Sequence, residues 1–227
     1  MRSLGDEMRA ATSAQARFHC IGRLARAWHG STPRGYEPSD LSAAEARLGF
    51  SLPKTVRYWF ESFALTEGIA FMQNHIVQPC EWRLVDGRLM FGEENQGNWR
   101  SLVDLEGDDP PVFAVDQHPG RLSSAFSVHA LQTALFETIM SSGAGTNGPG
   151  RHGAEPWARA FFGEPVVEPW DHAGPGPGAF YLGDPGLAFL QGESLEPWCF
   201  FALVDDDALL AEVEQTAPVD WVVAPTE

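Results

Sequence analysis

The chain has 227 residues, of which 44% are apolar and 11% aromatic, a composition that excludes an intrinsically disordered protein. Its 15 basic and 31 acidic residues give a formal charge of −16, so the protein is expected to repel phosphates and nucleic acid is not an expected partner. There is no apolar run of about 18 residues and no apolar N-terminal segment of the kind found in secretory signals, which predicts a cytoplasmic protein that does not span a membrane.

The first third of the chain carries helical patterns. Apolar residues recur every three or four positions over residues 4–28, with arginines on most of the other face, so one helix is expected there. A second helix is expected over residues 38–48, with Ser39 or Ser42 as its N-cap. A third is expected to begin at a proline and to end at a glycine, over residues 53–68.

A meander of strands follows. We expect four strands, at residues 82–85, 88–91, 98–104 and 111–116. Asp86-Gly87 lies between the first two and is typical of a two-residue hairpin turn. A helix is then expected over residues 127–141, and the glycine-rich residues 142–153 are expected to form a loop.

The last third mixes both kinds of pattern. We expect a short helix at 157–162, strands at 179–183, 187–191 and 198–204, a helix at 205–215 and a last strand at 219–223. Connections of hairpin length favour antiparallel pairing over a doubly wound sheet. Residues 1–227 are therefore predicted to form one α+β domain, with a central antiparallel or mixed sheet and flanking helices.

Three segments stand in an order that matches a known family. Residues 40–53 form an acidic helix pattern that ends in Leu-Gly, after which Leu-Pro begins the next helix. Residues 91–99 contain Glu-Asn-Gln-Gly followed by a tryptophan, and residues 109–113 read Asp-Pro-Pro-Val-Phe before the helix pattern of residues 124–140. In this order the segments resemble the SUKH (SMI/KNR-type) superfamily over residues 36–142. Residues 1–35 are then a helical extension, and residues 150–227 are less diagnostic.

The resemblance implies a protein that binds other proteins. Many bacterial members look like immunity proteins that neutralise toxins passed between competing cells, and a fungal relative is a scaffold in cell-wall regulation. The chain is therefore expected to be a non-catalytic immunity protein that binds a toxin domain and uses no cofactor or metal. The alternative is a scaffold or regulatory module with no toxin partner.

The turn in the middle of the SUKH-like region supplies the first candidate contact residues. Polar side chains around a turn, beside a tryptophan, are typical of a surface that holds a protein partner, which favours Glu93, Asn95, Gln96 and Trp99. The alternative is that Asn95 and Gln96 hydrogen-bond the turn backbone and that Trp99 fills the core. Glu93 and its neighbour Glu94 point to opposite faces of a regular strand, so an acid–base pair is not expected.

Charge is distributed unevenly, and this supplies the second set. Residues 1–36 carry a net charge of +4, whereas residues 152–227 carry fourteen acidic residues against one arginine. Asp205, Asp206 and Asp207 are the centre of this acidic segment. They are candidates for contact with a basic partner, of which a nuclease toxin is one example, and the alternative is a solvated face.

The remaining patterns do not point to an enzyme. Residues 143–148 match G-x-G-x-x-G, but an expected helix precedes them and Pro-Gly follows, which is the wrong context for a dinucleotide site. The three cysteines are widely spaced and the seven histidines include no H-x-x-x-H pair, so neither a disulfide framework nor a zinc site is expected. The cysteine pattern fits a reducing compartment.

Overall fold

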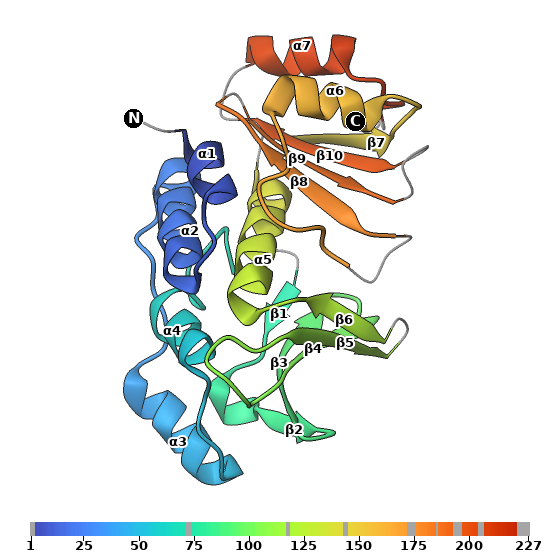
Figure 1. Ribbon diagram of the computed structural model, residues 1–227. Helices are drawn as coiled ribbons and strands as arrows, with labels where there is room; N and C mark the ends of the chain where they lie inside the picture. Colours follow the sequence, from blue (N-terminus) through green and yellow to red (C-terminus); the bar gives the residue numbers. More distant parts are fainter. Residues whose placement is uncertain are drawn as a thin grey trace, which may run out of the picture. The chain divides into compact units, whose positions relative to one another are not determined.

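The computed structural model describes residues 3–70, 74–116, 119–142, 145–171, 176–184, 186–192, 197–203 and 207–221. The chain divides into two compact units, which we call the central unit (residues 11–137) and the terminal unit (residues 1–10 and 138–227). Helices and antiparallel sheets make up the chain, which confirms the predicted α+β class, although the strands form two sheets instead of one (Figure 1). The interpretation of residues 1–227 as one domain stays a prediction.

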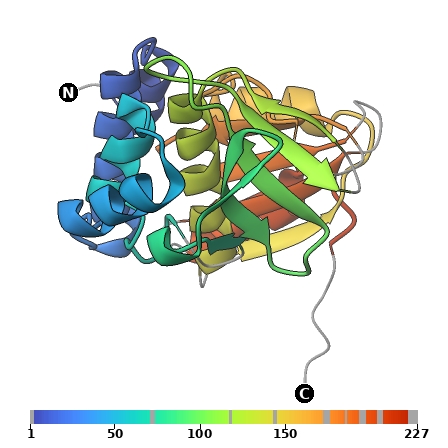
Figure 2. The ribbon, with the colours of Figure 1, turned by 90° about the horizontal axis from the view of Figure 1, so that it is seen from below.

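The central unit packs helices against one sheet. Its elements are α2 (Ala14–His29), α3 (Pro38–Leu48), α4 (Lys54–Ser62), β1 (Asn74–Ile76), η1 (Pro79–Glu81), β2 (Arg83–Val85), β3 (Arg88–Glu94), β4 (Trp99–Val103), β5 (Val112–Asp116), β6 (Gly120–Ser123) and the first part of α5 (Phe126–Ser141). The sheet order is β1-β3-β4-β5-β6, with β2 also paired to β3. Figure 2 shows α5 between the other helices of this unit and its sheet.

Local signals predicted the middle of this sheet well. Asp86 and Gly87 both have positive φ, 51° and 80°, as a tight hairpin between β2 and β3 requires. The expected strands at 88–91, 98–104 and 111–116 are present as β3, β4 and β5. The short strands β1 and β6 at the two edges were not predicted.

The single helix expected over residues 4–28 is two helices. The first, α1 (Leu4–Arg9), belongs to the terminal unit, and α2 begins after Ser13. The hydroxyl of Ser13 accepts a hydrogen bond from the backbone nitrogen of Ala16 at 3.3 Å. A serine N-cap of this kind starts a new helix, and the surrounding apolar periodicity concealed it.

The predicted capping of α3 was also wrong. Glu37 is the N-cap and makes no capping hydrogen bond with its side chain, while Pro38 occupies the first turn. Glu45 lies further along α3, where its carboxylate accepts the backbone N–H of Leu52 at 2.6 Å and pairs with Arg57. Glu45 therefore joins α3 to α4, which ends at Ser62 and not at Gly68 as expected.

The acidic Pro-Pro segment between β4 and β5 caps two helices. The carbonyl oxygen of Asp108 accepts hydrogen bonds from the backbone nitrogen and hydroxyl of Thr55, at 3.1 and 2.9 Å, in the first turn of α4. The carboxylate of Asp109 accepts from the backbone nitrogen and hydroxyl of Ser127, at 2.8 and 2.6 Å, in the first turn of α5. Two adjacent residues thus satisfy N–H groups that have no partner within either helix.

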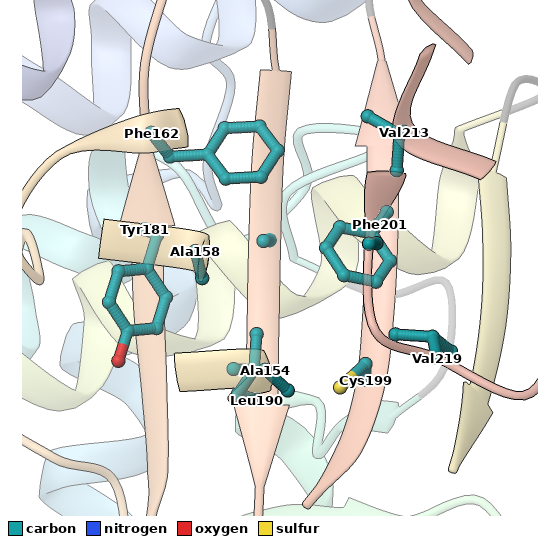
Figure 3. Packing of buried hydrophobic residues seen from close by; sticks show 11 residues of the cluster. Ala154, Ala158, Phe162, Tyr181, Leu190, Cys199, Phe201, Val213 and Val219 are labelled. Atoms are coloured by element: carbon teal, nitrogen blue, oxygen red, sulfur yellow. The ribbon is translucent and has the colours of Figure 1, made fainter. Parts of the chain in front are cut away.

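The terminal unit packs helices on a four-stranded sheet. Besides α1 and the end of α5 it contains β7 (Gly145–Pro149), α6 (Ala154–Phe162), β8 (Gly178–Leu182), β9 (Gly186–Gln191), β10 (Trp198–Leu203) and α7 (Asp207–Thr216), with sheet order β7-β10-β9-β8. Phe162 of α6, Phe201 of β10 and Val213 of α7 meet in its core, as Figure 3 shows. Trp157 of α6 packs edge-on against Phe201 at the border of this cluster.

Two expectations for this unit were wrong. The glycine-rich segment expected as a loop contains the strand β7, paired to β10. A Cβ atom at Gly148 would lie 2.2 Å from the carbonyl oxygen of Asp220, so glycine allows two backbones to touch there. Instead of the last strand expected from residue 219, the described residues show a single bridge between Gly150 and Val219, and residues 222 and 223 lie outside the described part.

Candidate functional site

The β3–β4 turn is built by a glutamate that was not among the candidate contact residues. The carboxylate of Glu94 accepts hydrogen bonds from the backbone nitrogens of Gln96 and Asn98, at 3.0 and 3.1 Å. Gly97, with φ of 73°, completes the turn. Because Glu94 holds the backbone, the exposed side chains of Asn95 and Gln96 are not the groups that close this turn.

The other predicted site residues are Trp99, Glu93 and the three aspartates, and they do not form one group in the described structure. Trp99 is only 4% exposed, which agrees with the alternative that it fills the core. Its side chain therefore offers no surface to a partner. Glu93 is half-buried on β3, at the same end of the hairpin as Asn95 and Gln96. Asp205 and Asp206 lie outside the described residues, and Asp207 begins α7 with its side chain outside the described part.

Strand register assigns Glu93 to the face of the sheet opposite α5. On the inner face, Phe91 contacts Phe126 of α5 edge-on at 5.4 Å between ring centroids. The bulge between Met90 and Gly92 breaks the alternation of β3, so Glu93 points away from the face that holds Phe91. Glu93 is paired with Arg100 on β4 and with His75 on β1, and residues directly opposite each other in a sheet point to the same side. Glu93 and these partners therefore lie on the outer face.

The same register brings four arginines onto this outer face. Arg83 on β2 is opposite Met90 on β3, and Met90 is opposite Leu102 on β4. Leu102 is opposite Phe113 on β5, and Phe113 is opposite Arg121 on β6. We call the set Arg83, Arg88, Arg100 and Arg121 the arginine face. Arg83 and Arg121 are exposed, and Arg88 and Arg100 are half-buried.

Packing fixes Arg88 at the middle of the arginine face. Its Nε donates to Asp104 Oδ1 at 2.6 Å, and its guanidinium carbon lies 3.7 Å from the centre of the Phe113 ring. An ion pair combined with a cation–π contact holds a guanidinium in one orientation. Beside it, Arg83 Nε lies 3.2 Å from the sulfur of Met90.

The arginine face contrasts with the acidic character of the chain. The central unit has eleven basic and fifteen acidic residues, a formal charge of −4, whereas the terminal unit has four basic and sixteen acidic residues, a charge of −12. The acids that the register and ion pairs place on the arginine face are Glu93 and Asp104, against four arginines. This face is therefore locally basic.

Sequence reasoning missed the arginine face because its members come from four different strands. The pattern that could have revealed it is the alternation of Arg88 with Met90 on β3, and of Arg100 with Leu102 on β4, on one side of each strand. Such alternation becomes informative only when the pairing of the strands is known. The bulge between Met90 and Gly92 shifts that pairing by one residue.

A buried serine and histidine lie on the inner face. The hydroxyl of Ser123 is 3.3 Å from His129 Nδ1, just beyond the separation of about 2.6–3.2 Å expected of a nucleophile and its base. Moreover, that hydroxyl donates to Gln132 Oε1 at 2.5 Å, and the serine and the histidine are each less than 5% exposed. We interpret the group as a structural network that holds α5 to β6.

The described residues contain no group of three or more His, Cys, Asp or Glu side chains placed to hold a metal ion. In the same part of the chain, no helix has both the length and the apolar character needed to cross a membrane. Comparisons of the chain with protein-family models, with curated proteins and with solved structures found no match. The resemblance to the SUKH superfamily therefore rests on the sequence segments alone and stays a prediction.

Proposed function

We propose that this chain is a non-catalytic protein-binding domain, of the immunity-protein type, that neutralises a toxin by direct binding in the cytoplasm. The observation that carries the proposal is the arginine face, which places four arginines on one partly exposed face of the sheet, with Arg88 and Arg121 beside Phe113. The ordered SUKH-like segments support the toxin as the kind of partner. None of the three cysteines forms a disulfide, which is compatible with a reducing compartment.

The residue types on this face support its assignment as a protein-binding surface. Arginine and aromatic residues are enriched at interfaces and dominate their binding energy. Arg88 is already held by Asp104 and Phe113, so binding would cost little of its side-chain entropy. Within the described part of the chain, neither Arg83 nor Arg121 makes an ion pair, which leaves both charges available to a partner.

The acidic terminal unit is the competing surface. Its charge of −12 would attract a basic toxin, whereas the arginine face would attract an acidic surface. We favour the arginine face because its side chains are arranged by strand pairing and packing, and because it includes Glu93, next to the polar turn that contains Gln96.

Co-expression tests the proposal. The chain is produced together with the product of the neighbouring gene in its native genome, and complex formation and cell survival are both measured. A stable complex together with protection from that product is the expected result. If there is neither complex nor protection, the proposal fails; a complex with a harmless host protein, without protection from any toxin, would favour the scaffold alternative instead.

A further inference from the structure

The central unit carries a surface hollow between α2 and α4, away from the sheet. Its volume is about 500 Å³, within the range of small-molecule sites. The side chains that matter for its chemistry are Phe18, His19, Arg26, Tyr58, Glu61 and Phe63. The arginine-bearing first part of the chain, which the proposed function does not use, thus forms one wall.

The floor of the hollow is aromatic. Phe18 lies 5.0 Å from Tyr58 and 5.9 Å from Phe63, measured between ring centroids, and the Phe18 and Phe63 rings are stacked. These two phenylalanines are buried, but Tyr58 is 49% exposed. An exposed ring supported by two buried ones offers a fixed apolar surface to a further planar group.

The cation of the hollow is Arg26. A Cβ atom at Gly22, one turn earlier in α2, would lie 3.6 Å from both terminal nitrogens of Arg26, so the guanidinium folds back over the glycine. Within the described residues Arg26 has no ion-pair partner. Glu61, the carboxylate in the hollow, accepts a hydrogen bond from Arg57 at 2.9 Å, and Arg57 also pairs with Glu45.

Helix α2 itself supplies no negative charge next to this cation. No acidic residue occurs between Glu7 and Glu37, so α2 carries arginines without any carboxylate of its own. Among them, Arg17 donates to the hydroxyl of Ser127 and is thus engaged within the protein. In a chain of charge −16, a helix with this composition is an exception that an anionic ligand would explain.

We propose that this hollow binds an aromatic carboxylate, with the carboxylate on Arg26 and the ring against Tyr58. The planar fork of a guanidinium matches a carboxylate in two parallel hydrogen bonds. The ligand is either a free small molecule or the carboxyl-terminal aromatic residue of a peptide, since both present the same groups. The site is separate from the arginine face and does not depend on the proposed function.

The test is a titration of the full chain with phenylacetate and with phenylacetamide, followed by NMR at the Arg26 side chain and the Tyr58 ring. Phenylacetate is expected to bind at least about tenfold more tightly than the amide, because only the acid forms charge-assisted hydrogen bonds. A dipeptide that ends in phenylalanine, compared with its amidated form, shows whether a peptide carboxyl terminus is accepted as well.

Matched variants locate the site. Arg26→Gln should reduce the affinity for phenylacetate to that for phenylacetamide, and Tyr58→Ala should weaken both ligands. Lys54→Gln removes a positive charge from an 80% exposed position at the start of α4 and should change neither affinity. Equal binding of acid and amide, unchanged affinity in Arg26→Gln, or no binding of phenylacetate at millimolar concentration would each overturn the proposal.

Discussion

The carboxylate of Asp109 accepts hydrogen bonds from both the backbone nitrogen and the hydroxyl of Ser127, at 2.8 and 2.6 Å. Ser127 is fully buried in the first turn of α5, so water cannot replace these bonds. The neighbouring carbonyl oxygen of Asp108 likewise accepts hydrogen bonds from the backbone nitrogen and the hydroxyl of Thr55 in α4. The acidic Pro-Pro segment, which belongs to the SUKH-like pattern, is thus a connector between two helices and the sheet.

Replacement of Asp109 by alanine should lower the free energy of unfolding by about 1–3 kcal/mol, because it leaves a buried N–H and a buried hydroxyl without their acceptor. Urea denaturation followed by tryptophan fluorescence measures the change. Asp108→Ala is the matched control, since its capping group is a backbone carbonyl and its exposed side chain pairs with exposed Lys54. That control should cost less than about 1 kcal/mol, and equal losses in the two variants would refute the capping role of Asp109.

A second prediction concerns the β3–β4 turn. Glu94→Ala should destabilise the protein by about 1–2 kcal/mol, since the carboxylate that accepts two backbone N–H groups is lost. Gln96→Ala, two positions later, should leave stability within about 0.5 kcal/mol because that side chain is exposed. Thermal unfolding of the two variants and of the parent protein provides the comparison, and a larger loss in Gln96→Ala would contradict this description of the turn.

Local patterns predicted those parts of the fold that nearby residues determine. Asp86-Gly87 specifies its hairpin by backbone conformation alone, whereas for Trp99 the sequence left both a contact surface and the core open, and the structure buries it. The strand β7 was missed because its Gly148 is required by the close approach of the Asp220 backbone, and Asp220 is distant in sequence. The arginine face was missed for a similar reason, since only the strand pairing of Arg100 and Arg121 through β5 brings them together.

The thiols should differ in reactivity. Cys80 is exposed, whereas Cys20 and Cys199 are buried, and burial raises the pKa of the Cys199 thiol to about 12. Because the thiolate is the reactive form, a water-soluble disulfide reagent should modify one thiol in the native protein and three after denaturation. Cys80→Ser should abolish the native reaction. Rapid modification that persists in this variant would show that one of the buried thiols is accessible.

Stability should fall at alkaline pH. Burial raises the pKa of Tyr181 from 10.0 to about 12 and that of Cys199 from 9.0 to about 12, so both neutral forms are favoured in the folded state. The contribution of these groups is complete below pH 9 and is lost as the pH rises towards 12. Melting temperatures measured across this range should decline less steeply for Tyr181→Phe than for the parent protein. An identical slope would show that Tyr181 does not contribute.

In the proposed function, the arginine face binds the partner. Its test is the affinity of the co-expressed partner, measured by titration calorimetry, for the double variant Arg83→Glu with Arg121→Glu. The control is Glu212→Arg with Glu214→Arg, which reverses two exposed charges on α7 in the terminal unit. We predict that the first variant binds at least about tenfold more weakly, with its melting temperature unchanged, and that the control stays within about twofold of the parent. A loss of affinity in the control but not in the arginine-face variant would contradict this proposal and place the interface on the acidic unit.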